Sequence, residues 1–324
     1  MERSEISLLA GIPTLDIRSF TEGKISERKL FVDQLGHAYE TIGFVAIHGH
    51  GIPDQLIEKL YDESRSFFGL PVQKKQKYAR PETNNQRGFV SMGVEHAKGS
   101  DEADLKEFWQ VGQPDPPSDG DPTHFPPNLQ VDELPAFQNA AVEAFRALEQ
   151  LGQTMLQAIA LHLEVDEDYF HNWVAGGNSI LRAIHYPPIL SEPSSAVRAG
   201  QHEDINLITL LVGASAAGLE VLRHDDVWVP VTAFPEHIVV NVGDMLQRLT
   251  NHKFKSTTHR VVNPPQIEWP NPRFSMPFFC HPRPNMKLDA MPHLLGEEES
   301  PIEGPISAGE YLEERLREIG LAKG

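Results

Sequence analysis

The sequence predicts a mainly β fold with flanking helices, in which a sandwich or jelly roll packs against one long helix. From residue 176 onward, short runs of β-branched and aromatic residues alternate with turn residues, and no long helix intervenes. This pattern is typical of an antiparallel sandwich or jelly roll rather than of a parallel sheet. Further upstream, apolar residues recur every three or four positions over residues 136–163, as they do in a helix that covers a sheet.

The N-terminal part of the chain is expected to alternate strands with helices. Hydrophobic periodicity predicts a strand over residues 12–17, a helix over 27–41, a strand over 43–47 and a helix that opens at Pro53 and ends near Gly69. Residues 78–128 are rich in proline, glycine and charge, and a long irregular stretch of this kind is usually a functional loop or a lid.

The C-terminal part is expected to consist of short strands. The predicted strands cover residues 180–186, 202–212, 219–222, 228–229, 237–241, 255–262 and 273–279, and a final helix covers 308–319.

Composition argues against several classes of partner. The 324 residues include 46 acidic and 28 basic side chains, which give a net charge of -18. Nucleic-acid binding depends on cations that neutralise phosphates, and anionic membranes also attract basic segments, so we expect neither partner. The single cysteine, Cys280, cannot form an intrachain disulfide. We find neither a signal peptide nor a segment that could span a bilayer, and therefore expect a cytoplasmic protein.

Two short stretches carry candidate metal ligands. His202 and Asp204 stand two positions apart at the start of a predicted strand, so both should point to one face while Glu203 faces away. His259 stands near the start of another β-rich run, STTHRVVN. Two imidazoles and one carboxylate form the facial triad that holds non-haem Fe(II) and leaves positions open for substrate and oxygen. The pattern predicts an iron site.

Several motifs, in a fixed order, resemble those of the Fe(II)/2-oxoglutarate-dependent oxygenases of the isopenicillin N synthase-like family. Residues 12–16 resemble the family's opening IPxxD strand, 43–52 its GFF…NHGI stretch, 104–112 its DxKE segment, 181–188 its YPP strand and 240–264 its VNxGDxLxxLTNxxxKSxxHRVVNP stretch, and an Arg-x-Ser pair follows at 273–275.

The resemblance implies a double-stranded β-helix (jelly roll) core packed on the long helix, within one compact unit over residues 1–324. It places an N-terminal oxygenase region with helices and lid loops at 9–120, the jelly-roll catalytic core at 176–285 and a C-terminal helix at 306–320. The implied activity is oxidation, most often hydroxylation, of a small organic molecule with release of succinate and CO2. We expect a monomer or a weak homo-oligomer.

The resemblance also assigns cofactors and binding residues. His202, Asp204 and His259 would bind Fe(II), which reacts with O2. Arg273 and Ser275, two apart on one strand face, would hold the distal carboxylate of the cosubstrate 2-oxoglutarate, and Tyr186 would donate a hydrogen bond to it.

Strand alternation puts two further residues on the face of Tyr186. Arg182 is a candidate for a cosubstrate or substrate contact, with an ion-paired scaffold residue as the alternative. Ile184 stands where many plant members of the family carry asparagine, so one contact is absent or replaced.

Other assignments remain open in the sequence. A 2-oxoglutarate-independent Fe(II) oxidase or oxidative cyclase of the same family, and a catalytically silent jelly-roll binding protein, are the alternatives to a 2-oxoglutarate-dependent enzyme. Asn241 and Asp244 are interpreted as turn residues rather than as residues that support the metal site. Residues 87–111 are a candidate substrate wall through Phe89, Met92, Phe108 and Trp109, with core packing as the alternative, and structural roles are expected for His50, His185, His252 and His281.

Overall fold

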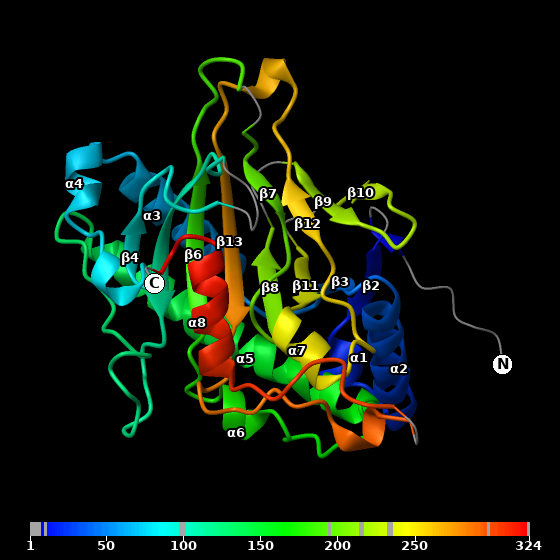
Figure 1. The fold of residues 1–324 in the computed structure, drawn as a ribbon. Helices are drawn as coiled ribbons and strands as arrows, with labels where there is room; N and C mark the ends of the chain where they lie inside the picture. Colours follow the sequence, from blue (N-terminus) through cyan, green and yellow to red (C-terminus); the bar gives the residue numbers. More distant parts are fainter. Residues whose placement is uncertain are drawn as a thin grey trace.

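The structure, a computed structural model, describes residues 8–9, 12–96, 102–193, 196–213, 217–231, 236–296 and 299–322. Within these residues the strands form two sheets. The larger sheet has the order β1 (Leu8–Leu9), β2 (Ile12–Asp16), β3 (Phe44–His48), β11 (Ile238–Val242), β8 (Ile208–Val212), β13 (Arg273–Cys280), β6 (Ile180–Tyr186), β5 (Glu107–Gly112) and β4 (Gly88–Val90). The smaller sheet has the order β10 (Trp228–Pro230), β9 (Leu219–Leu222), β12 (His259–Val261) and β7 (Ala199–His202). All strand pairs are antiparallel except β2 with β3 (Figure 1).

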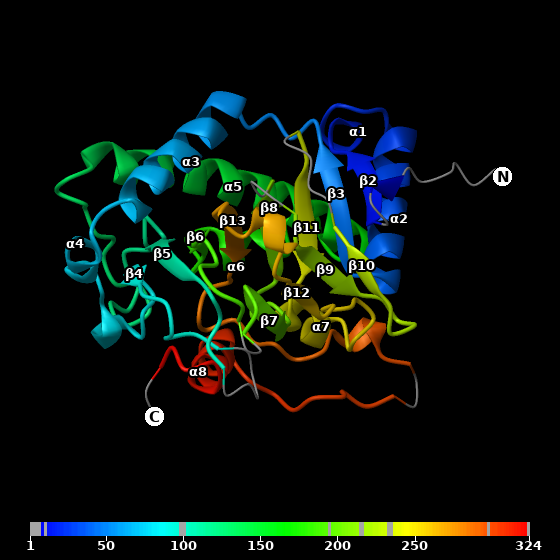
Figure 2. The same ribbon diagram turned by 90° about the horizontal axis from the view of Figure 1, so that it is seen from above.

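Helices cover one face of the larger sheet. The α-helices are α1 (Arg18–Thr21), α2 (Ile25–Thr41), α3 (Asp54–Phe68), α4 (Val72–Gln76), α5 (Pro135–His162), α6 (His171–Val174), α7 (Asp244–Leu249) and α8 (Ala308–Glu318), and short 3-10 turns cover Pro81–Thr83, Gln266–Glu268 and Pro292–Leu294. Figure 2 shows α3 and α5 along one face of the larger sheet and the smaller sheet with α8 on the opposite side. None of the helices in the described ranges has the length and apolar character needed to cross a membrane.

The long helix α5 anchors the core. Its buried residues include Phe145, Leu148, Met155 and Ile159, and the helix packs on β6, β8 and β13. The ring of Phe145 meets Phe278 of β13 edge-on, with centroids 5.0 Å apart. Each such apolar side chain contributes about 1.5–3 kcal/mol when it leaves water, so α5 holds the sheet that carries the cavity described below.

The predicted fold class is confirmed, and most predicted elements match within a few residues. One prediction was wrong: residues 202–212 do not form one strand. The chain leaves the smaller sheet after His202 and enters the larger sheet at Ile208. The polar residues Glu203 and Asp204 therefore lie in the connection between the two sheets and not in a strand.

A second prediction was also wrong, since residues 78–128 contain β4 and β5 rather than irregular loops alone. Every residue of β5 is buried. The charge in this strand misled the sequence interpretation. Glu107 is paired with Lys75 at 2.7 Å and lies 2.8 Å from Nδ1 of His185, and a buried charge is tolerated when it is paired in this way.

Candidate metal and cosubstrate site

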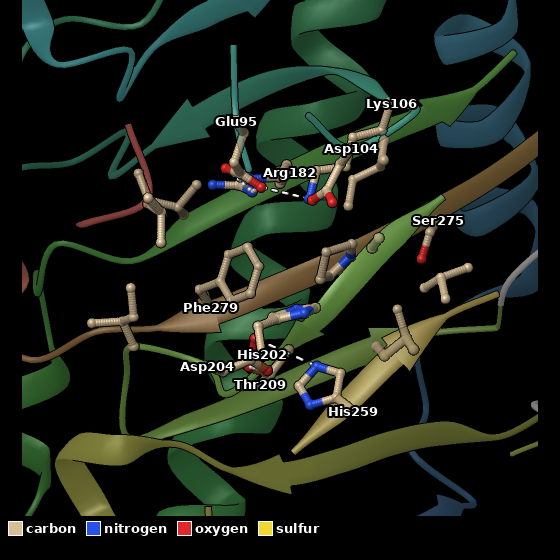
Figure 3. Close-up of a pocket in the computed structure, with 18 of the residues that line it drawn as sticks. Glu95, Asp104, Lys106, Arg182, His202, Asp204, Thr209, His259, Ser275 and Phe279 are labelled. Carbon is tan, nitrogen blue, oxygen red and sulfur yellow. Dashed lines mark hydrogen bonds and ion pairs between the residues drawn. The ribbon is translucent and has the colours of Figure 1, made fainter. Parts of the chain in front are cut away.

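A cavity of about 160 Å³ lies between the two sheets. Strands β6, β8, β11 and β13 of the larger sheet supply lining residues, as do β7, β9 and β12 of the smaller sheet. Side chains of Leu312 and Leu316 from α8 also line it. Figure 3 shows the predicted metal ligands on one side of this cavity.

The three predicted metal ligands converge. His202 is the last residue of β7, His259 is the first residue of β12, and the two are direct partners in the antiparallel ladder. Asp204 lies in the connection after β7, not in a strand as expected. One potential ligand atom from each residue lies within 4.8 Å of the others, with His259 Nε2 3.8 Å from Asp204 Oδ1. The donor set of two imidazoles and one carboxylate fits Fe(II).

Both imidazoles are oriented by backbone carbonyls. His202 Nδ1 lies 2.7 Å from the carbonyl oxygen of Gly200, and His259 Nδ1 lies 3.1 Å from that of Thr257. Because a carbonyl can only accept, each Nδ1 carries the proton and each Nε2 keeps its lone pair for a metal. Burial, with a smaller contribution from His259, lowers the pKa of His202 to about 4, so this imidazole is neutral at pH 7.

Two hydrogen bonds fix one oxygen of the Asp204 carboxylate. Its Oδ2 accepts hydrogen bonds from Thr209 Oγ1 at 2.6 Å and from Asn241 Nδ2 at 2.8 Å. Asn206 Nδ2 in turn donates to Thr209 Oγ1 at 2.7 Å. Burial opposes ionisation of Asp204, but His259, His202 and these two donors hold its pKa below the usual range. The bonds to Oδ2 leave Oδ1 to face the two imidazoles.

Sequence interpretation missed Thr209 and misassigned Asn241. Asn241 lies inside the buried strand β11 rather than in a turn. A signal was present, because a single polar residue within IVVNV or ITLLV must find a partner when the strand is buried. Asp244, in contrast, follows the strand and opens α7.

The predicted cosubstrate residues lie together at one end of the cavity. Arg273 of β13 pairs with Tyr186 of β6, and Ser275 pairs with Ile184. All four line the cavity. The guanidinium carbon of Arg273 lies 5.0 Å from the centroid of the Tyr186 ring, and Arg273 is 1% exposed. A buried guanidinium with a neighbouring hydroxyl is suited to one carboxylate.

Arg182 lies on the same face of β6 but nearer the other end of the cavity. Its Nη1 donates to Glu95 at 3.0 and 3.3 Å, and its Nε donates to Gln110 at 3.1 Å. Figure 3 shows Arg182 beside Glu95, with Lys106 and Asp104 close by and Ser275 apart from this group. The arginine is ion-paired and still lines the cavity.

The candidate substrate wall has a different composition from the expected one. Phe89, Phe108 and Trp109 are buried in the packing clusters and Met92 is 48% exposed, and none of these residues lines the cavity. The same region contributes polar residues instead: Glu95, His96, Asp104, Lys106 and Gln110. Strand alternation alone does not explain this exchange, because Phe108 and Gln110 stand two apart on β5 and share a strand face, yet only Gln110 lines the cavity.

Comparison with known proteins identifies the family. A model described as the N-terminal domain of non-haem dioxygenases in morphine synthesis matches residues 12–133, and the 2OG-Fe(II) oxygenase superfamily model matches residues 177–282. The chain is 31% identical to the 2-oxoglutarate-dependent dioxygenase frbA of Dothideomycetidae sp., over 88% of this chain and 90% of that protein. It is also 31% identical to the proline hydroxylase buaE of Petromyces alliaceus, over 94% and 98% of the two chains.

A solved structure supports the same assignment. The crystal structure of a full-length Neurospora crassa protein in complex with alpha-KG matches this fold with a TM-score of 0.85 and 31% identity, over 97% of this chain and 100% of that one. Together with the convergence of His202, Asp204 and His259, these similarities show that the chain belongs to the 2OG-Fe(II) oxygenase superfamily and is a 2-oxoglutarate-dependent dioxygenase.

Proposed function

We propose that the chain hydroxylates a small organic molecule in the cavity between its two sheets. In this proposal His202, Asp204 and His259 bind Fe(II), while Arg273, Ser275 and Tyr186 bind 2-oxoglutarate. The observation that carries the proposal is that both groups of residues line one cavity. Similarity to a protein named as a proline hydroxylase supports hydroxylation as the outcome.

The residues supply binding and orientation. Fe(II) and 2-oxoglutarate, when bound, supply oxidation by O2 with release of succinate and CO2. The triad would hold Fe(II) through three ligands, and a facial set of this kind leaves positions open for other ligands. The Arg273 guanidinium and the Ser275 hydroxyl donate to the distal carboxylate, and the Tyr186 hydroxyl supplies a further donor.

The cavity also limits access of water. The side chains of Leu312, Leu316 and Ile319 lie along it, and Leu316 is 7% exposed. Apolar cover over a reactive site suppresses side reactions with solvent. The C-terminal helix therefore has a role in the site as well as in the fold.

The direct test is anaerobic addition of Fe(II) and then 2-oxoglutarate to the metal-free protein. We expect a visible metal-to-ligand charge-transfer band that is absent from His259→Ala. Succinate release in air, measured with candidate substrates, then follows turnover. Iron binding without the band would contradict the assigned 2-oxoglutarate site, and absence of iron binding would contradict the assigned triad.

A further inference from the structure

The cavity has two chemically different ends along β13. Arg273, Ser275, Pro277 and Phe279 all line it, because residues two apart share a strand face, and His281 continues this row just beyond the strand. At about 3.3 Å per residue, the backbone positions of Arg273 and Phe279 are roughly 20 Å apart. If 2-oxoglutarate binds at Arg273, as proposed above, the end at Phe279 remains for the substrate. In Figure 3, Phe279 and Arg182 lie on one side and Ser275 on the other.

The charges of the cluster around Arg182 balance. Arg182 pairs with Glu95 at 3.0 Å, Glu95 pairs with Lys106 at 2.5 Å, and Lys106 pairs with Asp104 at 2.8 Å. Burial opposes ionisation of Glu95, yet Arg182 and Lys106 hold its pKa well below the usual range. Two cations therefore face two carboxylates. A substrate carboxylate would meet no net positive charge here and would lie close to two carboxylates of the protein.

One edge of Arg182 remains available for a ligand. Its Nη1 and Nε donate to Glu95 and Gln110, whereas Nη2 donates no hydrogen bond to any residue that the structure describes. The guanidinium is fixed by Phe108, whose ring centroid lies 4.2 Å from the guanidinium carbon, and by Phe279 at 5.2 Å. A donor held in this way is preorganised for an acceptor.

His281 presents a second polar group at the same end. Its side chain is 7% exposed and lines the cavity. In the described part of the chain its ring forms no hydrogen bond, and Nδ1 is a buried nitrogen without a partner. Burial lowers the pKa of His281 to about 4, so the ring is neutral at pH 7 and can both donate and accept. Buried polar groups without a partner are rare and are often satisfied by a ligand or an ion.

We propose that the substrate is a small uncharged molecule with a flat amide-type group: a carboxamide, a lactam or a carbonyl-bearing nitrogen heterocycle. Its carbonyl accepts from Arg182 Nη2, its flat face packs on the half-buried ring of Phe279, and a second polar atom bonds to His281. Amide groups present a carbonyl acceptor and an N–H donor in one plane, which matches a fixed donor and a neutral imidazole.

Calorimetric titration of the protein loaded anaerobically with Fe(II) and 2-oxoglutarate tests the substrate class. The probes are two matched pairs, nicotinamide with nicotinate and uracil with orotate. We expect the uncharged member of each pair to bind about tenfold more tightly, which corresponds to about 1.4 kcal/mol. Equal binding, tighter binding of the carboxylates or no binding by any probe overturns the inference. Failure of 2-oxoglutarate itself to bind would instead overturn the function proposed above.

Substitutions test the proposed substrate contacts of Arg182 and His281. Arg182→Lys keeps the positive charge beside Glu95 but removes Nη2, and His281→Leu removes both ring nitrogens at similar size. Each should weaken binding of the uncharged probes about tenfold, as expected for one lost hydrogen bond. His281→Asn, which keeps hydrogen-bonding atoms, should restore part of the loss.

The matched control is Arg146→Lys, because Arg146 pairs with Asp115 at the surface and both side chains are more than half exposed. This control should bind the probes as the unmodified protein does. Unchanged probe binding in both Arg182→Lys and His281→Leu would overturn the assignment.

Discussion

His202 and His259 face each other across the antiparallel pair of β7 and β12, with ring centroids 4.4 Å apart. Each ring is held by the carbonyl two residues before it, that of Gly200 or Thr257. The same local arrangement therefore occurs on both strands. Strand register sets the metal geometry, because a slip by one residue would turn either histidine to the other face.

Replacing a triad residue should abolish iron binding without unfolding the protein. In His202→Ala and Asp204→Ala, we expect loss of the Fe(II) and 2-oxoglutarate charge-transfer band and loss of substrate-dependent succinate release. The core around α5 does not depend on either side chain, so the far-UV circular dichroism spectrum should stay unchanged. Retained turnover in purified variant protein would disprove the metal assignment.

The triad could be predicted from the sequence because its signal is local. His202 and Asp204 are two residues apart, and the motif around His259 is continuous. The support for Asp204 could not be predicted in this way. Thr209 and Asn241 reach the carboxylate because β8 and β11 are neighbours in the larger sheet, and residue spacing does not encode which strands become neighbours.

Thr209→Val should weaken iron binding although Thr209 touches no metal. The substitution keeps the side-chain shape and removes the donor to Asp204 Oδ2, which leaves Asn241 as the remaining side-chain donor described for that oxygen. Removing such an outer partner typically costs about 10–100-fold in metal affinity. Anaerobic Fe(II) titration measures the effect.

Thr154→Val is the matched control for this substitution. Thr154 lies on α5 and, among the residues that the structure describes, donates only to the Gln150 carbonyl one turn earlier, so its removal should leave Fe(II) affinity unchanged. Equal affinities for iron in Thr209→Val and Thr154→Val would mean that the hydroxyl of Thr209 does not orient Asp204.

Arg273→Lys should raise the 2-oxoglutarate concentration needed for half-maximal turnover at least about tenfold, because lysine keeps the charge but lacks the planar fork that binds a carboxylate through two bonds. Fe(II) affinity should change little, since Arg273 lies beside Tyr186 rather than in the triad. Steady-state kinetics with varied 2-oxoglutarate gives the first quantity. Arg223→Lys, at a surface pair with Asp225, serves as the control. An unchanged requirement in Arg273→Lys would place the carboxylate site elsewhere.

The polar end of the cavity was the least predictable part of the site. Alternation on β6 correctly put Arg182 on the face of Tyr186, but its partner Glu95 lies 87 residues earlier in the chain. The sequence interpretation assigned residues 78–128 to functional loops or a lid, because the stretch is rich in proline, glycine and charge, and burial of an isolated charge is costly. Mutual pairing of Glu95, Lys106 and Asp104 removes that penalty, and such pairing is visible only once the fold brings the segments together.

We expect the contribution of Asp244 to the free energy of unfolding of the metal-free protein to fall as pH rises. Burial raises the pKa of this carboxyl to about 6, although Ser256 and Tyr311 donate hydrogen bonds to it. The folded state therefore holds a proton that the unfolded chain has already lost above its ordinary pKa of 3.8. The stabilisation is complete below about pH 4 and is lost as pH rises through about 6. By linkage, the stabilisation that is lost over this pH range amounts to about 3 kcal/mol.

Asp244→Asn isolates this effect, since asparagine has the same shape and does not titrate. The difference in free energy of unfolding between the unmodified protein and Asp244→Asn, from urea titrations at pH 4 to 8, should shift in favour of the variant as pH rises. Asp225→Asn gives a nearly flat control over this range, because the hydrogen bond from exposed Arg223 lowers the pKa of Asp225 to about 2, and its pH dependence therefore falls mainly below about pH 4. A difference for Asp244→Asn that does not vary with pH would show that Asp244 titrates normally in the folded protein, and that its contacts with Ser256 and Tyr311 fully offset its burial.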